Sequence, residues 1–137
     1  MGLDQTVYIV RAFPGLKGFY IRDDKGYEAV QAIDEITEPI GLRKEYAVQQ
    51  FMYETAQRRA GIKKPMEFYA AQLRITLEDI QSLYKLSAQQ LTEYAKRWAP
   101  NCWQYDEWNI EQVHNFCREV AMYIAFDDCA AYYESDW

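Results

Sequence analysis

The sequence predicts one α+β domain, in which about four helices pack on a small, mostly antiparallel sheet. The chain has 137 residues, the usual length of a single domain. Half of its residues are hydrophobic and 16% are aromatic, which is enough for a core without disulfides or metals. Short β-rich segments alternate with segments of helical periodicity, with no linker and no internal repeat. We therefore expect residues 1–137 to form a single domain.

The N-terminal residues predict an antiparallel hairpin. Residues 6–13, TVYIVRAF, are rich in β-branched and aromatic side chains and have the length of a strand. Pro14 and the glycine after it break this segment, and residues 19–22, FYIR, form the second predicted strand. The sequence does not decide between helix and strand for residues 27–37. Apolar side chains at every third position favour a helix, whereas the glycine and proline that bracket this short segment favour a strand.

The next part of the chain predicts a helix followed by a strand. Residues 42–60 have apolar side chains at helical spacing. Arg58 and Arg59 fall in the last turn, where cations interact favourably with the helix dipole, and Gly61 suits the left-handed residue that ends many helices. Residues 67–75, EFYAAQLRI, are expected to form the middle strand.

Two helix starts can be recognised from their caps. Thr76 is followed three residues later by Asp79, and Ser87 is followed by Gln90, which is the spacing of a capping box. Apolar residues at helical spacing follow each cap, and Pro100 ends the second helix.

The clearest helical pattern follows Asn109. We expect Asn109 to cap this helix, with Gln112 as its capping-box partner, and the apolar period continues as far as Ile124. Trp108 and Val113 have the positions of a hydrophobic staple around that cap.

The closing segment, CAAYYESDW, is predicted to be a sheet strand. Successive side chains of a strand point to opposite faces. One face then holds Tyr133, Ser135 and Trp137, and the other holds Tyr132, Glu134 and Asp136. We expect the first face to pack on the helices and Trp137 to close the core, while the second presents carboxylates beside a tyrosine.

The negative charge is concentrated in the C-terminal part of the chain. The net charge is −6. Residues 99–137 hold eight acidic residues and one arginine, a net charge of −7, whereas residues 1–98 carry +1. Such a surface repels nucleic acid and favours basic partners, so direct nucleic-acid binding is not expected. The basic residues at 58–64 are interpreted as a helix end and a solvated loop, since no phosphate loop or stacking platform accompanies them.

Composition argues against several other classes of protein. No apolar run is long enough to cross a bilayer, and the N-terminus lacks the basic and apolar regions of a signal peptide. The three cysteines have spacings that fit no metal template, so we expect no metal or other cofactor and a reducing, cytoplasmic setting. No hydrolase, zinc-protease, Walker or Rossmann motif is present, and we therefore do not expect an enzyme.

Two groups of residues are candidates for a site. His114 and Cys117 lie one turn apart among apolar residues, which favours a buried thiol over a catalytic pair. The second group has the mixture of aromatic rings and carboxylates found at protein interfaces. Its members are Tyr105, Asp106, Glu107, Trp108, Tyr132, Glu134 and Asp136. The alternative interpretation of Asp106 and Glu107 is that they only complement the dipole of the last helix.

Four segments, in this order, resemble a family of small uncharacterised phage and prophage proteins. The chain begins MGLD, has LRKEYAVQQF at residues 42–51 and YDEW at 105–108, and ends YYESDW at 132–137. Members of the family begin MGLDMYL, carry a WRKAN helix start and YDEW, and end YYxSxW. This chain departs from the family at Leu42, where the family tends to have Trp, and in the residues that follow MGLD and precede YDEW.

The resemblance implies a mobile-element protein of the bacterial cytoplasm and little chemistry. Together with the acidic, aromatic C-terminal part, it favours an interaction protein that binds a host protein as a counter-defence inhibitor of the anti-CRISPR kind. The partner surface would be basic and nucleic-acid-binding, and no membrane contact is expected. Two alternatives stay open. One is a small enzyme or ligand-binding protein with a pocket near His114, Cys117 and Trp108, and the other is a self-assembling module, such as a homodimer, that pairs its C-terminal strands.

Overall fold

The computed structural model describes residues 2–11, 38–69, 71–125 and 129–136, and these confirm the α+β class. The described residues form one sheet of four strands, each antiparallel to its neighbours, in the order β2-β1-β4-β3. The strands are β1 (Asp4–Arg11), β2 (Ile40–Arg43), β3 (Leu73–Ile75) and β4 (Cys129–Asp136). The two longest strands, from opposite ends of the chain, therefore form the centre of the sheet.

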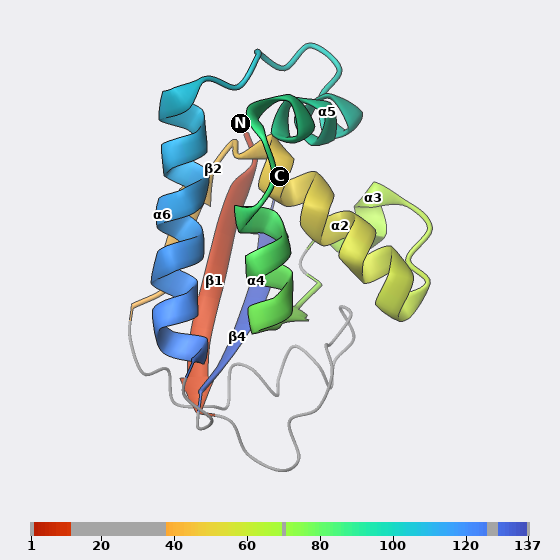
Figure 1. Ribbon diagram of the computed structural model, residues 1–137. Coiled ribbons are helices and arrows are strands. Elements are labelled where there is room, and N and C mark those ends of the chain that lie inside the picture. The colour runs from red at the N-terminus through yellow and green to blue at the C-terminus, as the bar shows by residue number, and fades with distance from the viewer. Residues whose placement is uncertain (1, 12–37, 70, 126–128, 137) are drawn as a thin grey trace.

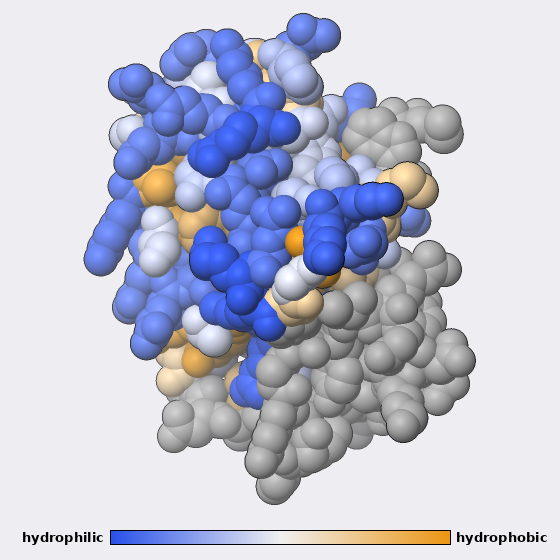
Figure 2. All heavy atoms as spheres, turned by 90° about the vertical axis from the view of Figure 1, so that its right-hand side faces the viewer, coloured by the Kyte–Doolittle hydropathy of each residue, from blue (hydrophilic) through white to orange (hydrophobic). Residues whose placement is uncertain are grey.

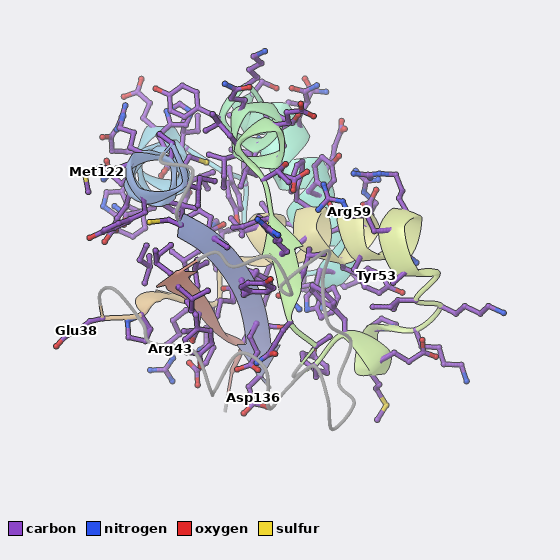
Figure 3. All side chains as sticks on the ribbon, turned by 90° about the horizontal axis from the view of Figure 1, so that it is seen from below. Glu38, Arg43, Tyr53, Arg59, Met122 and Asp136 are labelled. Atoms are coloured by element: carbon purple, nitrogen blue, oxygen red, sulfur yellow. The ribbon has the colours of Figure 1, made fainter. Side chains whose placement is uncertain are left out.

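Five helices are present in the described residues. They are α2 (Tyr46–Ala60), α3 (Pro65–Phe68), α4 (Leu77–Tyr84), α5 (Ala88–Trp98) and α6 (Glu107–Ile124). In Figure 1, α6 and α4 run along the sheet, α5 packs on α2, and α2 extends away from the sheet toward α3. Seen from below, α4 and α6 lie on one face of the sheet (Figure 3). None of the described helices combines the length and apolar character needed to cross a membrane.

The C-terminal strand is confirmed as part of the core. β4 pairs with β1 along its whole length, and Leu73 of β3 lies opposite Tyr133 on the other side of β4. Tyr133 belongs to the core under the helices, and Ser135 on the same face bonds to α2. Tyr132, on the opposite face, is also fully buried, so the prediction of a tyrosine presented to solvent there was wrong.

The caps of α4 and α5 are confirmed, and the cap of α6 is corrected. Thr76 and Ser87 each form the predicted capping box. The N-cap of α6 is Asp106, three residues before the predicted cap, and Asn109 is its box partner at the N3 position. Trp108 therefore lies inside the first turn, and its side chain is exposed, so it does not act as a hydrophobic staple.

Two predicted elements have different bounds in the structure. Leu42 lies in β2, opposite Gln5, and the helix begins only at Tyr46, after Lys44 with its positive φ turns the chain. Among the described residues of 67–75, Leu73–Ile75 form the strand. The start of that segment belongs to α3, because Pro65 at its N-terminus favours a helical turn and Phe68 is buried in the core.

Other predictions fall outside the described residues. These are the strand at 19–22, the segment 27–37 and the position of Trp137. Within the described residues, β1 pairs with β2 and β4.

Candidate functional site

Tyr105, the first residue of the predicted YDEW surface, lies in the interior. Its side chain is 2% exposed, and its hydroxyl donates a hydrogen bond to the carboxyl group of Glu45. Its backbone N–H donates to Oγ1 of Thr92 at 2.9 Å. Tyr105 therefore anchors the loop before α6, and it does not offer a ring to a partner.

The next three residues lie at the surface, and we call them the α6 acidic patch: Asp106, Glu107 and Trp108. Asp106 accepts the N–H of Asn109 at 3.0 Å as the helix cap, and Glu107 is the acidic residue of the first turn. Both positions stabilise the positive end of the helix dipole. Trp108 is 68% exposed, which is unusual for so large an apolar side chain. The patch thus combines an exposed indole with two exposed carboxylates.

The predicted binding residues of β4 do not extend this patch. Tyr132 is buried, and Glu134 is half-buried and accepts hydrogen bonds from Tyr8 at 3.3 Å and Gln72 at 3.4 Å. Asp136 is exposed, and it lies on the side of the sheet opposite α4 and α6 (Figure 3). The seven predicted residues are therefore divided between two surfaces and the interior.

The structure reveals a chain of buried side-chain hydrogen bonds that the sequence did not predict. We call it the buried polar network, and its members are Gln5, Glu45, Gln49, Tyr105, Tyr133 and Ser135. Gln5 Nε2 donates to the Tyr133 hydroxyl at 2.8 Å, and Tyr133 in turn donates to Gln49. Gln49 Nε2 then donates to Ser135 Oγ at 2.9 Å. The network joins the first residues of α2 to both central strands.

Glu45 forms the other end of the network, at the N-cap of α2. Its backbone N–H donates to Gln5 Oε1 at 2.8 Å, and its C=O accepts from Gln5 Nε2 at 2.9 Å. Burial raises the pKa of the Glu45 carboxyl from 4.5 to about 7, although the hydrogen bond from Tyr105 acts in the opposite direction. Burial also raises the pKa of the Tyr105 and Tyr133 hydroxyls, which therefore remain donors. The network suits a structural role, since its members are buried from solvent.

The Cys117 and His114 side chains do not form a catalytic pair. Burial raises the pKa of the Cys117 thiol to about 12, which keeps it protonated and unreactive. His114 stacks on the ring of Tyr84 at 4.1 Å, with Nε2 3.1 Å from the Tyr84 carbonyl oxygen. Cys117 borders an open hollow of about 280 Å³ between α4 and α6, but neither His114 nor Trp108 lines it.

A second hollow, which we call the aromatic cleft, lies between α2, α3 and α5. It has a volume of about 440 Å³, and its lining comprises Tyr46, Gln50, Tyr53, Pro65, Tyr69, Arg97, Trp98 and Ala99. Figure 2 views the side of the molecule that carries α2 and α3, where hydrophobic atoms form small patches within a largely hydrophilic surface. The sequence did not predict the cleft, because its aromatic residues come from separate elements.

No group of three or more His, Cys, Asp or Glu side chains that could hold a metal is found in the described part of the chain. In the comparisons with known proteins, no protein-family model, no curated protein and no solved structure matches this chain.

Proposed function

We propose that the protein is an interaction module that binds a basic protein surface through its α6 acidic patch. The observation that carries this proposal is the 68% exposure of Trp108 directly beside Asp106 and Glu107. Tryptophan is among the residues that contribute most to protein interfaces when a partner buries it. Leaving such a ring in water is unfavourable, and a binding partner would remove that cost.

The charge distribution supports a basic partner. The patch belongs to residues 99–137, whose net charge is −7, and Glu111 and Glu119 are exposed further along α6. A concentrated negative charge accelerates encounter with a positive surface and disfavours acidic partners. Because the sequence resembles phage proteins, we propose that this partner is a nucleic-acid-binding host protein and that occupation of its basic surface inhibits it.

The test uses variants that remove the patch and keep the helix cap. Asp106→Asn preserves the cap, since asparagine and aspartate are equally good in that position. Glu107→Gln and Trp108→Ala complete the triple variant. A partner captured from a bacterial host lysate by the wild-type protein is expected to bind the triple variant at least tenfold more weakly. Duplex DNA is expected to compete with the wild-type complex.

Met66→Ala serves as the control, because this side chain is 82% exposed but lies on α3. It is expected to leave the affinity unchanged. Equal binding of the triple variant and the control would refute the α6 acidic patch as the contact surface. A captured partner that duplex DNA does not displace would refute the proposed inhibition at a nucleic-acid-binding surface.

A further inference from the structure

The aromatic cleft has a wall of rings that meet at right angles. Trp98 lies edge-on to Tyr53, with 5.6 Å between ring centroids and 73° between planes, and edge-on to Tyr69 at 5.9 Å and 85°. Figure 3 shows Tyr53 on the side of α2 that faces α3, where it also contacts Phe68 at 5.9 Å. Because Phe68 belongs to the core, this side of the wall is fixed by the packing of the fold.

Among the described lining residues of the cleft, no uncompensated charge would select an ionic ligand. Arg97 is the charged residue among those described in the lining, and its Nη1 forms an ion pair with Glu54 at 3.3 Å. The Arg97 guanidinium also lies 4.3 Å from the ring centroid of Tyr94. Glu54 accepts a further hydrogen bond from Gln50 at 2.9 Å. An arginine at the wall opposes a cationic ligand, and its pairing with Glu54 weakens the attraction for an anion.

Three side chains of the cleft lining have a hydrogen-bond donor that is available to a ligand. Within the described part of the chain, the hydroxyls of Tyr46 and Tyr53 and the indole N–H of Trp98 have no hydrogen-bond partner. The tryptophan indole can only donate, and phenol hydroxyls donate readily. An apolar ligand that presents carbonyl acceptors would complement these donors.

We propose that the aromatic cleft binds a proline-rich peptide segment in the polyproline II conformation. Proline supplies a rigid apolar ring, and its carbonyl is an acceptor that is not accompanied by an N–H donor. Polyproline II segments are extended before they bind, so they lose little conformational entropy, and aromatic-lined grooves are their usual recognition sites. Here the half-buried rings of Tyr69 and Trp98 would pack on proline rings, and the free donors would bind the peptide carbonyls.

A titration of the ¹⁵N-labelled protein with a ten-residue polyproline peptide tests this proposal. Tryptophan indole N–H signals are few and can be assigned by single substitutions. We expect a saturable shift of the Trp98 signal and none of the Trp108 signal. A ten-residue glycine-serine peptide of equal length is the control ligand, and it is expected to leave Trp98 unchanged.

Three variants locate the site. Tyr69→Ala removes a half-buried ring from the wall and is expected to weaken polyproline binding at least tenfold. Tyr46→Phe keeps the ring, loses only the hydroxyl, and is expected to weaken binding severalfold. Trp108→Ala changes the α6 acidic patch and is expected to bind polyproline like the wild type. Trp108→Ala separates the two proposals, since this variant should lose binding to the basic protein partner and keep binding to polyproline.

Several outcomes would overturn the inference. One is the absence of any Trp98 response at millimolar peptide, and another is an equal response to the glycine-serine peptide. A response of Trp108 without Trp98 would place the peptide on a different surface. Binding of a free aromatic molecule such as indole-3-acetate, without binding of polyproline, would make the cleft a small-molecule site instead. If Tyr69→Ala does not fold, as judged by circular dichroism, Tyr46→Phe still decides whether the cleft is used.

Discussion

Tyrosines of this protein occupy two contrasting environments. In the buried polar network, the hydroxyls of Tyr105 and Tyr133 bond to Glu45 and Gln49, and both side chains are enclosed. In the aromatic cleft, Tyr46 and Tyr69 are half-exposed and border an open hollow of about 440 Å³. The two regions lie close together, because Trp103 contacts the rings of both Tyr46 and Tyr105.

The two regions differ most in the hydroxyl groups of their tyrosines. A tyrosine whose hydroxyl bonds to other buried groups serves the fold, whereas one whose hydroxyl has no such partner is available to a ligand. A buried hydroxyl must find a partner inside the protein, because an unpaired one costs free energy. Tyr133 therefore both accepts from Gln5 and donates to Gln49. The hydroxyl of Tyr46, by contrast, has no partner within the described residues and can serve a ligand at little cost.

The largest expected effect comes from removing one ring in each region. Tyr133→Ala deletes a fully buried ring that stacks on Phe68 at 6.0 Å, and it leaves polar groups of the network without a partner. We expect it to lower the free energy of unfolding by about 5 kcal/mol, enough to unfold a marginally stable domain. Tyr69→Ala should cost less, about 1 kcal/mol, because its ring is only half-buried and meets Trp98 edge-on.

Urea unfolding followed by circular dichroism measures both free energies. An equal loss of unfolding free energy in Tyr133→Ala and Tyr69→Ala would contradict the distinction between tyrosines that stabilise the fold and tyrosines that are available to a ligand. The m-value should be unchanged in any variant that remains folded, because its unfolding exposes a similar surface.

Local sequence predicted those parts of the fold that depend on nearby residues. The caps at Thr76 and Ser87 were correct because each box is completed within three residues. The start of α6 was misplaced because Asp106 and Asn109 are both favourable caps with a partner three positions later. The choice between them depends on Tyr105, which is fixed by Thr92 and Glu45 from elsewhere in the chain.

Long-range contacts account for what the sequence did not predict. Leu42 continues the helical apolar pattern, but pairing with Gln5 on β1 places it in a strand. Glu45 resembles a solvated helix residue, although Gln5, 40 positions away, holds it inside. The sequence predicted Trp108 as a candidate surface residue, and its side chain is exposed. The burial of Tyr105, three residues earlier, was not predicted, because it depends on Glu45 and the α2 amide of Ala47.

The second expected effect concerns Glu45 and the pH dependence of stability. Its pKa is about 7 in the folded protein and 4.5 ordinarily, so the folded state holds the proton more tightly than the unfolded state. The resulting stabilisation is complete below pH 4.5 and is lost as the pH rises through 7. The shift corresponds to about 3 kcal/mol. We therefore expect the titration of Glu45 to lower the free energy of unfolding of the wild type by about 3 kcal/mol between pH 4.5 and pH 8.

Glu45→Gln isolates this contribution. Glutamine keeps an oxygen that can accept from Tyr105, and it does not titrate. The decrease between pH 4.5 and 8 should therefore be smaller by about 3 kcal/mol in Glu45→Gln than in the wild type. Urea unfolding at a series of pH values provides the measurement, and Glu107→Gln, at an exposed position of the α6 acidic patch, should retain the wild-type decrease. The same pH profile in Glu45→Gln and the wild type would show that Glu45 does not titrate in this range.

The smallest expected effect comes from removing single hydroxyl groups and leaving the rings in place. Tyr133→Phe deprives Gln49 of its donor and Gln5 of one acceptor, and both amides are buried. We expect a loss of about 2 kcal/mol, the cost of unsatisfied buried polar groups. Tyr46→Phe should change the free energy of unfolding by less than about 0.5 kcal/mol, because its hydroxyl has no partner in the described structure. Thermal and urea unfolding of the two variants side by side provide the measurement. A loss of similar size in Tyr46→Phe would mean that its hydroxyl also serves the fold, and the cleft would then lack one of the donors that its proposed peptide ligand requires.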